Sequence, residues 1–266
     1  MFNHANISLS QDEKDRLFLT WLAYTNFQKL KDNQQELKRT WLNLKEEVSP
    51  YFRNYKHSLE EISGTCGKMS LTANPEVAFC FDSDSNTITF NVLNLFFSSC
   101  PDREGHDFVS TLPWKLGGQL VHEFDHFLFF KENSLAKTKK EADEFCDKHL
   151  VEMETSAFTN QIEFLENAKT NASISTIMNV IKVDSWTVEG EPLLNKKSHS
   201  YMLSKSEVIS QINQQISHFT RLLEHMNTDY TEIGNSNNKG LNLKMLKILG
   251  LKALNKNGNG YLKLDL

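Results

Sequence analysis

The stretch GQLVHEFDHFLFF, residues 118–130, places two histidines, a glutamate and an aspartate in an otherwise apolar run. Ionisable groups are costly to bury unless something compensates them, and no such partner stands within the run. Pro113 precedes the stretch and a polar linker, KENSLAKTKK, follows it, so residues 112–131 are typical of a helix buried on most sides. The partner must come from outside this helix, and a bound metal ion is the obvious candidate.

Within this run His122, Glu123 and His126 form an HExxH pattern. Histidines four positions apart project from one helix face, one turn apart, so both imidazoles can reach one ion at the roughly 2.0 to 2.1 Å that zinc requires. The intervening glutamate points about 100° around the helix and can hold a water on the ion without being a ligand. The pattern predicts zinc held by His122 and His126, with Glu123 as general base for hydrolysis.

The rest of the chain predicts a helix-dominated α+β fold. A hydrophobic fraction of 39%, with only 5 prolines and 11 glycines in 266 residues, is typical of a folded globule. Residues 70–97 predict a β-hairpin, in which EVAFCF and TITFNVLNLFF flank the turn composition DSDSN. Apolar periodicity predicts one or two long helices before Pro50, which begin with a capping box at Ser10 and Glu13. It also predicts a helix at 139–168 and another that begins with a capping box at Ser204 and Glu207. A last helix is expected in the lysine-bearing tail from residue 239, and an Asn-Gly turn follows it.

These elements suggest three regions: N-terminal helices over 1–60, a core over 61–170 and a helical C-terminal region over 171–266. After Thr170 only a short strand at 186–188 and a loop through GEPLLNKKSHS are expected. The net charge of −5 gives no electrostatic reason to expect nucleic acid as a partner. Four cysteines without a CxxC pair, no secretory leader pattern and no long apolar window predict an intracellular, cytoplasmic protein without a transmembrane segment.

The order of a β-hairpin, an apolar HExxH helix and an acidic second helix resembles the zincin metallopeptidases. It is most similar to the gluzincins, in particular the minimal gluzincins and the heat-shock membrane proteases. The resemblance covers residues 70–168. HEFDHFLFFKE lacks the glycine and third histidine of HExxHxxGxxH, so the metzincin branch does not fit. The resemblance implies a zinc peptidase whose third ligand is a glutamate on the second helix, and a cleft whose upper rim, TITFNVL, binds an extended peptide or protein substrate.

Six acidic residues on the second helix are candidates for the third ligand: Glu141, Asp143, Glu144, Asp147, Glu152 and Glu154. Measured from Ala157 on the apolar stripe, Glu154 lies about 60° away and Asp143 about 40°, whereas Glu141 and Glu144 point elsewhere. Glu154 also begins ETSAFTNQ, which is similar to the glutamate-helix signature of several gluzincins, although Phe158 stands where many of them carry an aspartate. We expect Glu154 as the ligand. Asp143 is the alternative, in which case Asp147, one turn further on, could orient a histidine.

The resemblance leaves three points open. His199 or Tyr201, in the loop after the second helix, could supply a donor for the oxyanion of a hydrolytic intermediate. The HExxH pattern fixes the nucleophile and not the acyl group, so a hydrolase of non-peptide amides or esters is an alternative to a peptidase. A second alternative is a non-catalytic interaction protein in which zinc stabilises the helical core. Water access to the metal would distinguish such a structural site from a catalytic one.

Overall fold

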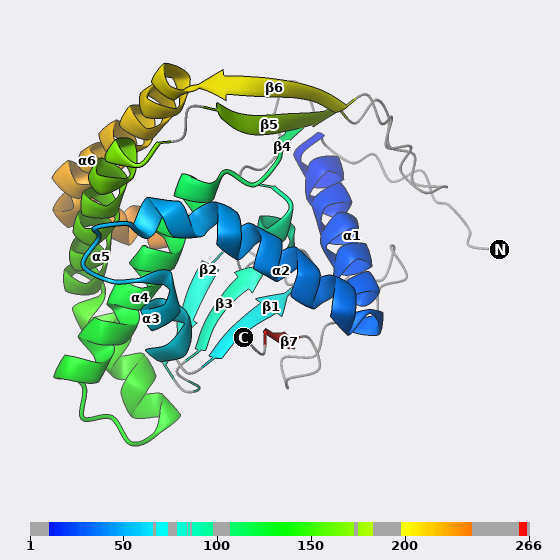
Figure 1. Ribbon diagram of the computed structural model, residues 1–266. Coiled ribbons are helices and arrows are strands. Elements are labelled where there is room, and N and C mark those ends of the chain that lie inside the picture. Colours follow the sequence, from blue (N-terminus) through cyan, green and yellow to red (C-terminus); the bar gives the residue numbers. More distant parts are fainter. Residues whose placement is uncertain are drawn as a thin grey trace.

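The computed structural model describes residues 11–65, 68–73, 79–83, 85, 87–97, 107–172, 175–182, 198–235 and 261–264. Helices dominate these ranges and two small sheets accompany them, which confirms the helix-dominated α+β prediction (Figure 1). The α-helices are α1 (Gln11–Asp32), α2 (Gln34–Val48), α3 (Leu59–Thr65), α4 (Pro113–Asn133), α5 (Lys139–Thr170) and α6 (Lys205–Asn235), with 3-10 helices η1 (Ser49–Phe52) and η2 (Val92–Leu95).

The larger sheet has four strands in the order β2-β3-β1-β7. The central strands β1 (Lys68–Thr72) and β3 (Thr87–Asn91) are parallel, and the outer strands β2 (Phe79–Asp82) and β7 (Tyr261–Leu264) run antiparallel to their neighbours. A second, antiparallel sheet contains β4 (Asp107–Val109), β5 (Ser175–Lys182) and β6 (Ser198–Ser204). The predicted hairpin is therefore confirmed as β2 and β3.

The position of the hairpin in the sheet corrects the expected cleft rim. TITFNVL was expected to form the rim, but its strand β3 lies between β2 and β1 and is buried along its whole length. Both sides of β3 are thus already hydrogen-bonded to neighbouring strands. Strand β2 is the outer strand on the side of α4. Among the described strands, none pairs with the edge of β2 that faces away from β3.

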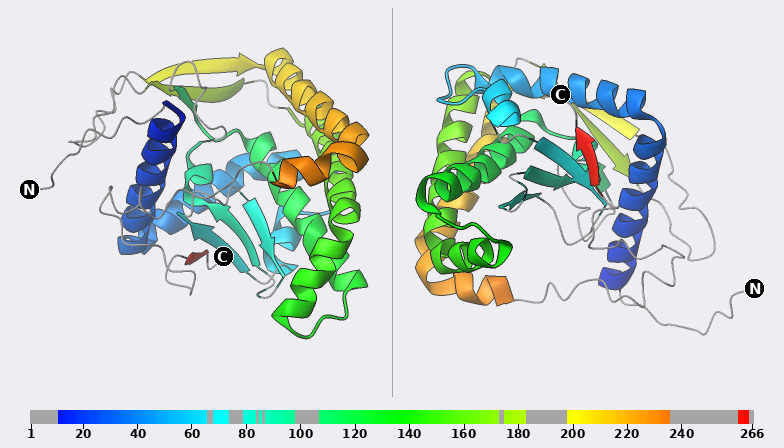
Figure 2. Two further views of the ribbon diagram at one scale, coloured as in Figure 1. Left: turned by 180° about the vertical axis from the view of Figure 1, so that it is seen from behind. Right: turned by 90° about the horizontal axis from the view of Figure 1, so that it is seen from below.

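Helix α2 crosses one face of the larger sheet, while α4, α5 and α6 stand beside it (Figures 1 and 2). Trp41 of α2 packs on Phe90 of β3, and Phe81 of β2 packs edge-on against Phe127 of α4. One hydrophobic cluster runs from Ala23 in α1 to Ile212 in α6 and so includes side chains from all three predicted regions. The N-terminal helices contribute to the same core that supports α4.

Helices α4 and α5 form an antiparallel pair joined by residues 134–138 (Figure 1). Pro113 starts α4, where its missing N–H costs nothing, and a capping box between Thr138 and Glu141 starts α5. The two helices approach closely near Gly117, whose absent side chain leaves room for the Phe164 ring. This pair sets the relative positions of the HExxH residues and the acidic residues of α5.

The C-terminal region contains more sheet than the sequence indicated. Strand β5 and its long pairing with β6 were not predicted, and Ser198–Ser200, expected in a loop, lie in β6. The predicted strand at 186–188, the basic tail helix, the Asn-Gly turn and the Ser10 cap lie outside the described residues. The capping box at Ser204 and Glu207 is confirmed, since each residue bonds the other's backbone N–H.

Among the described helices, none is both long and apolar enough to cross a membrane.

Candidate metal centre

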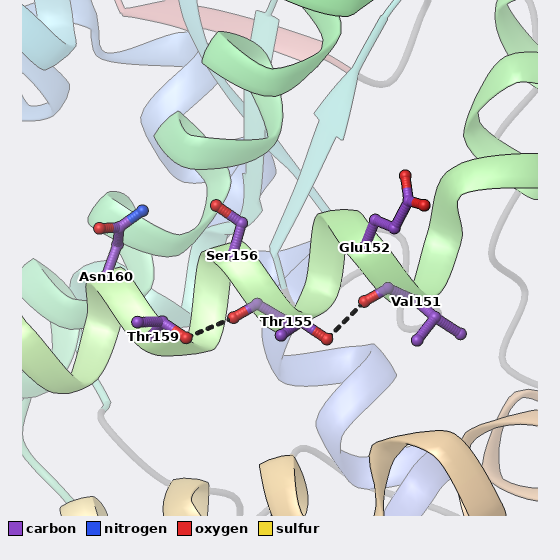
Figure 3. A pocket seen from close by; sticks show the side chains of 6 residues that line it. All are labelled: Val151, Glu152, Thr155, Ser156, Thr159 and Asn160. Atoms are coloured by element: carbon purple, nitrogen blue, oxygen red, sulfur yellow. Dashed lines mark hydrogen bonds between the residues drawn. The ribbon is translucent and has the colours of Figure 1, made fainter.

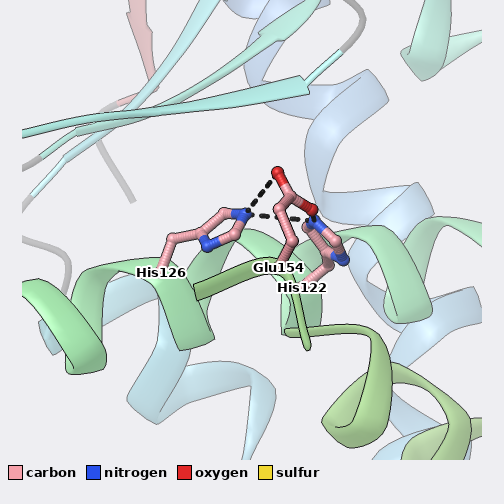
Figure 4. Close-up of side chains that lie close together, drawn as sticks. All are labelled: His122, His126 and Glu154. Atoms are coloured by element: carbon pink, nitrogen blue, oxygen red, sulfur yellow. Dashed lines mark hydrogen bonds and ion pairs between the residues drawn. The ribbon is translucent and has the colours of Figure 1, made fainter. Parts of the chain in front are cut away.

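The side chains of His122, His126 and Glu154 converge between α4 and α5 (Figure 4). The two Nε2 atoms lie 3.1 Å apart, and the Glu154 carboxylate reaches both, with Oε2 3.3 Å from His122 Nε2 and Oε1 3.6 Å from His126 Nε2. One ligand atom from each residue falls within 4.8 Å of the others, so the group could hold a metal ion. We call these residues the triad.

The triad is largely shielded from solvent. The three side chains are only 10–14% exposed, and the two histidine rings meet edge-to-face at 4.7 Å. Two imidazoles and a carboxylate form a donor set typical of zinc, with a fourth position left for water in catalytic sites. The donor types and their convergence therefore fit the ion that the HExxH pattern predicts, although they do not identify the metal.

The other acidic candidates on α5 have different roles. Glu141 belongs to the capping box that starts the helix, and Glu152 bonds His149 at the surface. Asp143, Glu144 and Asp147 are exposed. The structure brings Glu154, and none of these five, to the two histidines, in agreement with the helical register of α5.

Glu123 lies beside the triad and is buried. Its carboxylate accepts a hydrogen bond from the backbone N–H of Phe81 in β2. Burial raises the pKa of Glu123 to about 7, assisted by the Glu154 charge and opposed by His122. Glu123 thus links the triad to the edge strand of the sheet and lies at the side of α4 that HExxH geometry predicts.

The two histidines differ in their electrostatics. Burial, together with the charge of His122, lowers the pKa of His126 to about 4. Burial also acts to lower the pKa of His122, but the hydrogen bond that His122 donates to Glu154 and the charges of Glu123 and Glu154 outweigh it and raise that pKa. Glu154 therefore favours the protonated form of His122, and a metal ion bound at the same place would neutralise the same carboxylate.

The far sides of the two imidazoles are enclosed as well. Each Nδ1 atom is buried and has no hydrogen-bond partner at bonding geometry among the described residues. The Phe158 ring lies 4.6 Å from the His122 ring and itself stacks on Phe219 of α6 at 5.5 Å. Gln161, buried two turns beyond Glu154, also acts on His122, as one of the groups that raise its pKa.

Asp125, the remaining acidic residue of the apolar run, lies outside the triad. It is buried, Asn160 of α5 donates to it, and Ser156 bonds it too. Burial raises the pKa of Asp125, and these two hydrogen bonds and the charge of Lys56 oppose that rise. Asp125 therefore links α4 to α5 through hydrogen bonds that do not involve the proposed metal ligands.

A pocket of about 580 Å³ lies along α5 (Figure 3). Its lining follows the helix at positions 151, 152, 155, 156, 159 and 160 and includes none of the triad. These positions form a stripe on the side of α5 turned away from Glu154. We therefore locate the candidate chemistry at the triad and not in this pocket.

Neither candidate oxyanion donor occupies the expected loop. His199 and Tyr201 both lie in β6, opposite Val180 and Met178 of β5, and the His199 side chain lies outside the described part of the chain. Tyr201 is 51% exposed, and the described contacts of the triad do not include it. An oxyanion role for either residue stays a prediction.

Comparison of the chain with models of known families, with curated proteins and with solved structures finds no match. The case for a function therefore depends on the triad and its surroundings.

Proposed function

We propose that the protein is a zinc-dependent hydrolase, most concretely a metallopeptidase of the gluzincin type. The observation that carries the proposal is the convergence of His122, His126 and Glu154 from two helices, with a further buried glutamate, Glu123, beside them. A purely structural zinc site is usually closed by four protein ligands, commonly including cysteine. Among the described residues the structure gathers three ligands, which favours a catalytic site with a place for water.

Each residue has a distinct role in this proposal. His122, His126 and Glu154 would hold the zinc, which would supply a bound water with a pKa of about 7 and polarise a carbonyl. Glu123 would take the proton from the water as its oxygen bonds to the carbonyl carbon, and would pass that proton to the leaving amine as the C–N bond breaks. Among the described strands β2 is the edge strand beside Glu123, so an extended peptide would add along its outer side, and the hydrogen bond from Phe81 to Glu123 connects this strand to the general base.

The two alternatives keep the same ligands. A non-peptide amide or ester hydrolase would use the same water and base on another acyl group, and a zinc-stapled interaction protein would use the metal for stability alone. The edge strand next to Glu123 favours a peptide over a small amide, because strand addition recognises a peptide backbone.

A single substitution separates catalysis from structure. Glu123→Gln keeps the shape and both imidazoles but removes the base, so we expect zinc to stay bound while cleavage of a broad peptide library falls by about three orders of magnitude or more. Glu144→Gln, an exposed acid on α5, serves as the matched control and should cleave like the wild type. Unchanged turnover in Glu123→Gln would refute the mechanism. Zinc-loaded wild-type protein that cleaves no peptide would favour the alternatives.

A further inference from the structure

Gln161 is a polar side chain in an apolar environment. It lies on the buried stripe of α5 with Ala157 and Phe164 and is only 4% exposed. A buried amide is costly unless it forms hydrogen bonds, and a core position of this kind would otherwise take leucine or methionine. The position of Gln161 therefore requires a polar partner.

The triad supplies that partner. Gln161 follows Glu154 by seven residues, two helical turns along the same face of α5. Its amide packs on Gly118 of α4, where an added Cβ would lie 3.4 Å from the amide nitrogen. Side chains on a helix lean towards its N-terminus, so the His122 ring lies over the turn that contains Gly118. Gln161 and His122 thus share one buried space between the helices.

Within this space the two ring nitrogens of His122 have different surroundings. Nε2 meets His126 and Glu154, whereas Nδ1 is buried without a partner at bonding geometry among the described residues. Phe158 covers the ring at 4.6 Å but has no atom that accepts a hydrogen bond. A histidine that binds metal through Nε2 carries its proton on Nδ1, and that N–H ordinarily donates to an oxygen.

We propose that Gln161 is the positioning residue of the metal centre, whose amide oxygen accepts the Nδ1 proton of His122 and so fixes the tautomer that presents Nε2 to zinc. The inference rests on the proposed function for the identity of the ion. Hydrogen bonds at such sites are often long before the ligand binds and shorten in the loaded state. Gln161 is one of the side chains that raise the pKa of His122 through hydrogen bonding, while His122 Nδ1 has no partner at bonding geometry among the described residues of the metal-free structure.

Two substitutions at position 161 test the assignment. Gln161→Met keeps the volume but removes the acceptor, whereas Gln161→Glu keeps an acceptor oxygen. We expect zinc affinity, measured by competition with a chromogenic chelator, to fall about 10 to 100-fold in Gln161→Met and to stay near wild type or rise in Gln161→Glu. Gln214→Met, the same exchange at an exposed position of α6, should leave affinity unchanged.

A second readout needs no zinc. Proton–nitrogen NMR of the imidazoles in the metal-free protein should show a hydrogen-bonded Nδ1–H of His122 in the wild type and lose that hydrogen bond in Gln161→Met. Equal affinity and an unchanged Nδ1–H signal in Gln161→Met would overturn the inference. An equal loss of affinity in the Met and Glu variants would also overturn it, because it would indicate packing alone. If the wild type binds no zinc, the proposed function fails and the Nδ1–H measurement alone decides whether Gln161 bonds His122.

Discussion

Glu154 Oε2 lies 3.3 Å from His122 Nε2, across the interface between α4 and α5. The same carboxylate reaches His126 through its other oxygen, so one acidic side chain spans both imidazoles. In the metal-free protein the hydrogen bond to Glu154 and the charge of its carboxylate raise the pKa of His122 against the opposing effect of burial. With a metal ion bound, the same three groups would be its ligands, and the ion would neutralise the carboxylate.

Removing this carboxylate should release the metal. Glu154→Ala leaves two imidazoles, and we expect zinc affinity to fall by more than about 100-fold, together with a lower melting temperature of the zinc-loaded protein. Asp143→Ala is the matched control, because Asp143 is an exposed acid on the same helix. Isothermal titration with zinc measures the affinity of both variants. Loss of zinc in Asp143→Ala with retention in Glu154→Ala would replace the gluzincin assignment by an aspartate-liganded site.

The stability of the metal-free protein should depend on pH through Glu123. The pKa of this group is raised to about 7 in the folded protein from 4.5 when exposed, so folding favours its protonated form. Its contribution to stability is complete below the unfolded pKa and is lost as pH rises through the folded pKa. Compared with the wild type, Glu123→Gln should therefore gain roughly 1 to 3 kcal/mol between about pH 5 and pH 8.

Urea unfolding in the presence of a chelator measures this difference. The opposite pH dependence that His126 contributes, from its lowered pKa, is common to both proteins and cancels in the comparison. The contribution of His122 does not cancel, because the charge of Glu123 is one of the causes that raise its pKa, and its loss adds to the difference between the two proteins. Parallel stability curves for wild type and variant across this range would show that Glu123 is ionised in the folded protein, contrary to the effect of its burial.

The two glycines before the HExxH residues should respond differently to alanine. A Cβ at Gly117 would lie 2.6 Å from Phe164 Cζ and 3.3 Å from Phe52, so Gly117→Ala should destabilise the protein by about 1 to 3 kcal/mol. At Gly118 the nearest atoms lie at ordinary contact distances, and higher helix propensity should make Gly118→Ala neutral or stabilising by up to about 1 kcal/mol. Thermal unfolding of the two variants checks this, and equal effects would mean that α4 and α5 are not packed this closely.

Local patterns were sufficient to predict the helices that carry the triad. Histidines at 122 and 126 must share a face of any helix, and the register of α5 separated Glu154 from Glu141 and Glu144 without knowledge of the packing. The choice of Glu154 over Asp143 depended on the resemblance, because both lie near the apolar stripe. The structure brings Glu154, and not Asp143, to the two histidines, and this depends on how α4 and α5 pack, which no local pattern contains.

Features set by long-range pairing could not be predicted. The sequence of β3 reads as a strand, but its place between β2 and β1 depends on a parallel partner that precedes the hairpin, so the expectation that β3 lies at an open edge was wrong. Strand β6 begins in what reads as a polar loop and becomes a strand through its pairing with β5. The sequence analysis did not single out Gln161, although a glutamine on the apolar stripe of the helix, two turns from Glu154, was a signal that could have been followed.

The metal content of the purified protein tests the central claim most directly. Inductively coupled plasma mass spectrometry should find close to one zinc per chain in the wild type after reconstitution and dialysis, and almost none in His122→Ala, since one imidazole and one carboxylate hold zinc far more weakly than three ligands. His149→Ala, which removes a histidine of α5 that pairs with Glu152 outside the triad, should keep its zinc. A folded wild-type protein that retains no zinc, or His122→Ala that retains as much as the wild type, would contradict the metal centre.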